Sequence, residues 1–178
     1  MTESNDYGGL AKTFHWLAAF FVVLAWLLGT FIDDLPKSWE PRVIFTHMTL
    51  GLTILAVLVL RVGWRFARPV PVLATRLGPT IEQLARAMQW LLYALMIAVP
   101  ATGIVLAFAR GQSVPLFGLA EIASPWARDR AFARSVTEVH ETVANSLLIL
   151  AGLHAAAALF HHYALKDRTL LRMLPGRR

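Results

Sequence analysis

The stretch SVTEVHETVANSLLILAGLHAAAALFHHYAL, residues 135–165, decides the fold of this chain. Between Thr142 and Leu165 it contains no Asp, Glu, Lys or Arg. A helix of about 20 residues rises about 30 Å, which is the thickness of the hydrocarbon core of a bilayer. We therefore predict a membrane-spanning helix over residues 135–165.

Three further apolar stretches of similar length precede it, at residues 10–32, 43–66 and 84–108. Charged residues with proline or glycine follow each of the three. Pro100 lies inside the third stretch, where neighbouring helices can satisfy the carbonyl that it leaves free, so a kink is expected there. The sequence thus predicts an all-α integral membrane four-helix bundle that forms a single domain over residues 1–178.

The composition agrees with a chain whose surroundings are lipid. Hydrophobic residues make up 57% of the sequence and charged residues 16%, whereas a soluble domain carries about 25% charged residues. Cysteine is absent from the sequence, which excludes disulfides and thiolate ligands. A bound metal would have to be held by histidine, methionine, carboxylate or backbone groups.

An even number of spans places both termini on the same side of the membrane. Eleven of the 17 basic residues fall on that side and six on the other, so the positive-inside rule predicts that both termini lie in the cytoplasm. We interpret the net charge of +6 as a consequence of this topology. The expected partners therefore include membrane lipid and no nucleic acid.

Four of the six histidines fall at matching depths on the predicted helices. His140 and His154 are fourteen residues apart, so they share one face of the last helix at heights that differ by about 21 Å. His15 begins the first span from the inner side, and His47 begins the second from the outer side. The predicted pairs are His15 with His154 inside and His47 with His140 outside.

Two imidazoles at each level indicate haem as the cofactor. Bis-histidine ligation gives a six-coordinate iron that is suited to electron transfer. A zinc site needs three or four ligands at one level, and this arrangement offers two. Gly51, four residues after His47, and Gly152, beside His154, are interpreted as leaving room for a flat macrocycle.

At these residues the sequence resembles the bacterial cytochrome b561 family over nearly its whole length. The resemblance implies a multi-pass protein of the bacterial inner membrane with two haem b groups, and the four paired histidines coincide with the haem ligands of that family. It is carried most clearly by three segments, His47 with Gly51, Arg110-Gly111 with Phe117-Gly118-Leu119, and His140 to Met173.

The last of these segments is similar to family members described as superoxide oxidases, which pass electrons from superoxide to ubiquinone. That similarity implies an oxidoreductase that oxidises superoxide at the periplasmic face and reduces ubiquinone in the membrane. His161, about 10 Å beyond His154 along the helix, and Lys166 are the candidates for the quinone site. The candidates for electrostatic steering of superoxide are Arg42, Arg110, Arg128, Arg130 and Arg134.

Other functions remain open at this stage. The chain could instead be a haem b relay that exchanges electrons between quinol and a redox protein. A cofactor-free transporter or structural subunit is the alternative from another class, although the span interiors hold almost no charged residues. Whether a second copy of the chain is a partner is also left open.

Overall fold

The structure is a computed structural model that describes residues 8–67 and 78–174. The predicted ends of the domain, residues 1 and 178, lie outside the described residues. So do four of the eleven basic residues that were counted on the cytoplasmic side: Arg68, Arg76, Arg177 and Arg178. The helices are α1 (Gly9–Thr30), η1 (Ile32–Asp34), α2 (Glu40–Ala67), α3 (Pro79–Ala109), α4 (Arg130–Tyr163) and η2 (Leu171–Met173), and the strands are β1 (Val114–Leu116) and β2 (Ala120–Ile122).

The predicted membrane four-helix bundle is confirmed, because α1, α2, α3 and α4 are each long and apolar enough to cross a bilayer. Helices α3 and α4 each begin five residues before the predicted stretches. Pro79 occupies the first turn of α3, where the missing N–H costs nothing. Asp129 caps α4 by accepting hydrogen bonds from the backbone N–H groups of Ala131 at 2.9 Å and Phe132 at 3.0 Å. The helices therefore extend beyond their apolar parts.

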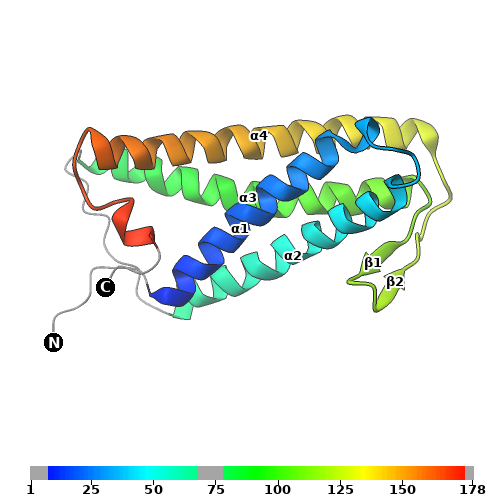
Figure 1. Cartoon of the computed structure of the whole chain (residues 1–178), viewed down its shortest axis with the longest axis horizontal. Coiled ribbons are helices and arrows are strands. Elements are labelled where there is room, and N and C mark those ends of the chain that lie inside the picture. The colour runs from blue at the N-terminus through cyan, green and yellow to red at the C-terminus, as the bar shows by residue number, and fades with distance from the viewer. Residues whose placement is uncertain (1–7, 68–77, 175–178) are drawn as a thin grey trace.

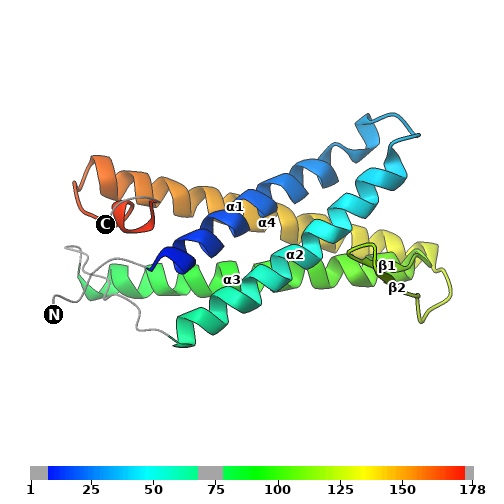
Figure 2. The same cartoon turned by 60° about the horizontal axis from the view of Figure 1, so that its bottom comes forward.

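The bundle consists of two antiparallel helix pairs (Figures 1 and 2). Helix α1 packs mainly on α2, and α3 packs mainly on α4, with fewer contacts between the two pairs. We call the end where α1 begins and α4 ends the termini end. The opposite end, where α1 meets α2 and where β1 and β2 lie, is called the strand end (Figure 1).

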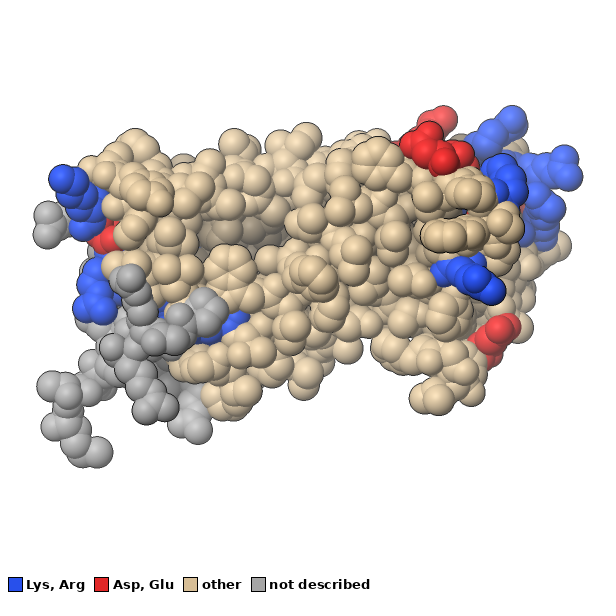
Figure 3. Space-filling model, viewed as in Figure 1, with Lys and Arg blue, Asp and Glu red and all other residues tan. Residues whose placement is uncertain are grey.

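Few side chains of the bundle are buried, and many large apolar ones face outwards. The core of the bundle is a narrow cluster formed by Ala18, Val22, Ala25, Ile54, Val57, Leu58, Tyr93, Met96 and Leu147. Charged side chains gather at the two ends, and the middle of the face seen in Figure 3 shows none. An apolar middle between charged ends is what a hydrocarbon layer requires, so the chain is a multi-pass membrane protein.

The segment between α3 and α4 contains a two-stranded antiparallel hairpin that the sequence did not predict. Val114 of β1 pairs with Ile122 of β2. The turn between the strands uses positive φ angles at Phe117 (55°) and Gly118 (75°). A β-carbon at Gly118 would lie 3.4 Å from the ring of Phe45, so the turn packs closely on the first part of α2.

Candidate functional site

The structure brings His47 of α2 and His140 of α4 together near the strand end. Their ring centroids are 6.1 Å apart, and their ring planes make an angle of 79°. This is the outer pair predicted from the sequence. We call it the strand-end pair.

His15 of α1 and His154 of α4 come together in the same way towards the termini end. Their ring centroids are 6.4 Å apart, and the angle between their planes is 71°. This is the predicted inner pair, called here the termini-end pair. Both pairs join one helix pair of the bundle to the other, with α4 contributing one histidine to each.

The spacing within both pairs fits an iron ion held between two imidazoles. Metal–imidazole bonds are about 2.0 Å long and each ring centre lies about 1 Å behind its nitrogen, so two axial rings stand about 6 Å apart. Among the described residues no three His, Asp, Glu or Cys side chains form a group that could hold a metal ion. Each pair therefore offers two ligands, which suits a haem whose macrocycle fills the other four positions.

Both histidines of the strand-end pair are oriented by an oxygen at Nδ1. The Nδ1 atom of His47 lies 2.9 Å from the carbonyl oxygen of Ala25. That of His140 lies 3.0 Å from the hydroxyl oxygen of Thr102. Contacts of this kind fix the tautomer and the ring orientation of histidines that bind metals, and they leave Nε2 free for the metal.

Two glycines that were not predicted from the sequence make room for these rings. A β-carbon at Gly29 would lie 3.0 Å from Cε1 of His47, and one at Gly103 would lie 3.2 Å from Cε1 of His140. By contrast, Gly51 lies near Pro100, with 3.9 Å between the two β-carbon positions, and a β-carbon at Gly152 would meet no atom within 4 Å. Sequence spacing singled out Gly51 and Gly152 because they are near histidines along the chain, whereas Gly29 and Gly103 approach theirs across a helix interface.

The surroundings of the termini-end pair differ from those of the strand-end pair in the hydrogen bonds that they offer to Nδ1. The Nδ1 atom of His15 is buried and has no hydrogen-bond partner among the described residues. Beside it, the indole N–H of Trp16 donates to the carbonyl of Met173 at 2.8 Å. One turn before His15, the buried ammonium of Lys12 donates to the carbonyl of Leu174 at 3.2 Å. The chain after α4 thus returns to the beginning of α1.

His161, a predicted quinone-site residue, is paired with Asp167. Its Nδ1 lies 2.6 Å from Oδ2 of Asp167, and both side chains are only 12% exposed. Burial raises the pKa of Asp167, but hydrogen bonds from His161 and Thr169 outweigh it, so the pKa of this carboxyl lies below its ordinary value. Asp167 was missed because nothing in the sequence shows that the chain turns back after Tyr163.

The turn that makes this pair possible is at Lys166, the other predicted quinone-site residue. Lys166 adopts a φ of 53°, a left-handed conformation that is uncommon for a residue other than glycine. The turn lets the backbone N–H of Asp167 donate to the carbonyl of His161 at 3.1 Å. His162, next along α4, instead lies edge-on to Tyr163 at 4.8 Å between ring centroids.

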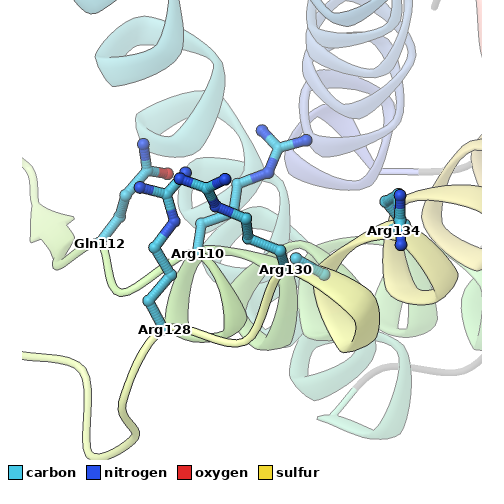
Figure 4. Close-up of a pocket in the computed structure, with 6 residues that line it drawn as sticks. Arg110, Gln112, Arg128, Arg130 and Arg134 are labelled. Atoms are coloured by element: carbon cyan, nitrogen blue, oxygen red, sulfur yellow. The ribbon is translucent and has the colours of Figure 1, made fainter.

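Four of the five arginines predicted to steer superoxide line one pocket at the strand end. The pocket has a volume of about 610 Å³ and is lined by Arg110, Gln112, Arg128, Arg130, Ala133 and Arg134. Figure 4 shows these arginines around the junction between the end of α3 and the beginning of α4, with Arg134 set apart from the other three. Arg42, the fifth, is at the start of α2 and does not line the pocket.

A tight turn after α3 builds this pocket. Gly111 has a φ of 69°, and a β-carbon there would lie 3.2 Å from the β-carbon of Arg128. The backbone N–H of Asp129 donates to the carbonyl of Ala109 at 3.0 Å, which joins the start of α4 to the end of α3. Gly111 is thus the residue that lets Arg128 come close to Arg110.

Acidic side chains do not neutralise the arginines of the pocket. Within the described part of the chain none of them forms an ion pair. Glu121 accepts a hydrogen bond from Ser113 at 2.6 Å, and Asp129 is occupied as the cap of α4. Arg110 donates to the hydroxyl of Thr137 at 3.2 Å. The pocket therefore presents positive charge that is free to attract an anion.

Comparison with known proteins gives matches over nearly the whole chain. The family model described as prokaryotic cytochrome b561 matches residues 6–176. A Yersinia pestis protein named probable superoxide oxidase CybB is 36% identical over 176 residues, which cover 98% of both chains. Cytochrome b562 of Cereibacter sphaeroides is 32% identical and covers 99% of this chain and all of its own. Cytochrome b561 homolog 2 of Escherichia coli is 32% identical over 94% of this chain and 90% of its own.

Proposed function

Because the chain belongs to the prokaryotic cytochrome b561 family, whose members transfer electrons across membranes with b-type haem, we propose that it oxidises superoxide and reduces ubiquinone. In this reaction two superoxide anions give two molecules of dioxygen, and the quinone takes up two electrons and two protons to form the quinol. The strand end faces the periplasm and both termini lie in the cytoplasm of a bacterium, so the protein resides in the inner membrane.

His47 and His140 would hold one haem b, and His15 and His154 would hold the other. Bound haem supplies reversible one-electron transfer at its iron. The protein contributes the four imidazoles, their separation along the bundle and an apolar surrounding. The contacts of Ala25 with His47 and of Thr102 with His140 keep the two strand-end rings in the tautomer that can bind iron.

The observation that carries the choice of superoxide is the pocket of arginines, which have no acidic partners among the described residues. Arg110 is two helical turns beyond Gly103, which packs on His140, so the pocket is about 10 Å from the strand-end pair along the bundle. A patch of one sign of charge raises the local concentration of a small anion and the rate of its arrival. The name of the Yersinia pestis relative, probable superoxide oxidase CybB, supports the same assignment.

His161 is the residue proposed to form a hydrogen bond with the quinone. With Nδ1 on Asp167, the ring can present Nε2–H to a quinone carbonyl, and Asp167 stabilises the imidazolium from which a proton is donated. Lys166 follows in the same turn and can stabilise negative charge that develops on the quinone. Both residues lie at the end of α4 from which protons of the cytoplasm would come.

The test is an absorption spectrum of the purified, oxidised protein mixed with an enzymatic source of superoxide, with and without added quinone. We expect b-type haem bands that become reduced with superoxide and oxidised again when quinone is added. Superoxide dismutase added beforehand is the control and should abolish the reduction.

Two other outcomes separate the alternatives. Haem bands that dithionite reduces and superoxide leaves unchanged would contradict the proposed donor and favour a relay with a protein partner. A purified protein without haem bands would contradict the haem sites themselves and favour the cofactor-free alternatives.

A further inference from the structure

The two histidine pairs differ in what their Nδ1 atoms contact. At the strand end both imidazoles contact oxygen, His47 at the carbonyl of Ala25 and His140 at the hydroxyl of Thr102. At the termini end, Nδ1 of His15 is buried without a hydrogen-bond partner in the described ranges 8–67 and 78–174. The imidazole of His154, within α4, forms no hydrogen bond in these ranges either. The two pairs have similar distances between their rings. They differ in whether an oxygen contacts Nδ1 of the imidazoles.

From this difference we propose that Thr102 and the carbonyl of Ala25 lower the reduction potential of the strand-end haem below that of the termini-end haem. The electron is then favoured at the termini end, where the quinone is proposed to bind. The haem that His47 and His140 would hold would give up one electron and the haem that His15 and His154 would hold would take it up, with no bond made or broken. The inference rests on the two haem sites of the proposed function, but it does not depend on superoxide or quinone as reactants.

The direction of the two hydrogen bonds follows from the partners. A carbonyl oxygen only accepts, so Nδ1 of His47 must carry the hydrogen that goes to Ala25. The hydroxyl of Thr102 has one hydrogen, which it gives to the carbonyl of Ala98 or Val99, each 2.9 Å away. Its oxygen is then free to accept from Nδ1 of His140. Both strand-end imidazoles therefore act as donors through Nδ1.

An acceptor at Nδ1–H makes an imidazole a more basic ligand. A more basic ligand gives more charge to the iron and stabilises the ferric state relative to the ferrous state, so the reduction potential falls. Hydrogen bonding of this kind is one of the ways in which a protein tunes a haem. Nδ1 of His15 is buried without such a partner among the described residues, and the imidazole of His154 forms no hydrogen bond there, so their haem keeps the higher potential.

The glycines show how the same asymmetry is built. Gly29 is four residues after Ala25, and its missing side chain lets His47 reach that carbonyl. Gly103 follows Thr102 and leaves the space that His140 occupies. Among the glycines of the described residues, none lies within 4 Å of His15 or His154 in this way. In the part of the chain that the structure describes, the close approach that permits hydrogen bonding is built at the strand end.

The arginines of the pocket act in the opposite sense, because positive charge stabilises the ferrous state. Their side chains are exposed, and water with salt screens exposed charges strongly. The contacts of His47 and His140 lie inside the bundle, where electrostatic effects of hydrogen bonds are larger. We therefore expect the hydrogen bonds to decide the order of the two potentials.

The experiment is a redox titration of Thr102→Val with mediators, followed by haem absorption and low-temperature electron paramagnetic resonance. Wild type should show two potentials, and the variant should raise only the lower one. We expect about a tenfold change in the one-electron equilibrium constant, which corresponds to about 59 mV. Thr102→Ser keeps the hydroxyl and should restore the wild-type value. Thr53→Val removes a half-buried helix hydroxyl whose one hydrogen-bond partner among the described residues is the carbonyl of Thr49, and it should change neither potential.

A shift of the higher potential in Thr102→Val, or a shift of neither, would overturn the inference. Thr102→Ala removes the same hydroxyl without adding a group, and it takes the place of the valine variant if that one does not bind haem. A protein whose lower potential responds as expected but whose haems are not reduced by superoxide would contradict the proposed reaction and leave this inference standing.

Discussion

Gly103 lies so close to His140 that a β-carbon at position 103 would stand 3.2 Å from Cε1 of the imidazole. That distance is shorter than ordinary van der Waals contact, and α3 and α4 pack on each other. The ring therefore has little freedom to move away. Space at this one backbone position decides where a predicted haem ligand sits.

We expect Gly103→Ala to displace the imidazole of His140 and to reduce the haem content of the strand-end site. Overpacking of this kind costs about 1–3 kcal/mol. The measurement is the ratio of haem to protein in the purified variant. Gly63→Ala is the control, because a β-carbon at that helical, exposed position would meet no atom within 4 Å. Full haem content in Gly103→Ala would show that the ring can move without losing the metal.

Replacing one histidine at a time should remove one haem at a time. His154→Ala should abolish the termini-end haem and leave the strand-end haem, and His47→Ala should do the reverse, because the pairs share no residue. Haem content and the number of potentials in a titration are the readouts. His162→Ala should retain both haems, since its ring contacts Tyr163. Loss of both haems in the folded His154 variant would contradict two separate sites.

The arginines of the pocket should raise the rate of reduction by superoxide. Arg128→Gln combined with Arg130→Gln should slow the reaction about tenfold at low salt, within the range expected for steering of a charged reactant. The difference from wild type should shrink as ionic strength rises, because salt screens exposed charges. Lys37→Gln removes one exposed charge at the same end, already paired with Glu40 at 3.3 Å, and should have little effect. A rate of wild type that does not depend on salt would remove steering from the mechanism.

The pairing of His161 with Asp167 should make the stability of the folded protein depend on pH in the acid range. The pKa of Asp167 in the folded protein is below its ordinary value of 3.8. The stability that the ionised carboxylate contributes is therefore fully present above pH 3.8, and it is lost as the pH falls through the folded-state pKa. Asp167→Asn should lower stability by about 1 kcal/mol at neutral pH, and the difference should vanish in strong acid. Thermal unfolding in detergent at several pH values measures it. Asp33→Asn, an exposed residue in η1, should change stability at neutral pH by less than about 0.5 kcal/mol.

The hydrogen bond from Trp16 to Met173 should hold the chain after α4 against α1. Trp16→Phe keeps an aromatic ring and removes the donor, so hydrogen exchange in η2 should become faster. Trp39→Phe, at an exposed tryptophan of the strand end, is the matched control. Unchanged exchange in the Trp16 variant would mean that the contact of Lys12 with Leu174 is sufficient to hold the segment.

The helices and the two histidine pairs could be predicted because both depend on regular spacing along one helix. Fourteen residues between His140 and His154 fix a common face, and apolar length fixes a span. The order of the spans then sets which of His15 and His47 lies at which depth. None of this needs knowledge of how helices pack.

What the sequence did not reveal depends on contacts between helices or on the course of loops. Gly29 and Gly103 meet their histidines across an interface, and a single sequence gives no register for such an interface. Asp167 reaches His161 only because Lys166 turns the chain with a positive φ. The hairpin of β1 and β2 and the exclusion of Arg42 from the pocket likewise follow from how the segment after α3 folds back on the bundle.

Each histidine pair takes one member from the helix pair α1–α2 and the other from α3–α4. Neither half of the chain therefore contains both members of a pair, although each half contains two of the proposed ligands. If the chain were cut between α2 and α3, the halves would carry four separate half-sites. Binding of haem iron by two histidines would then require that the two halves associate. The haem absorption of a mixture of the two fragments would therefore measure their association directly.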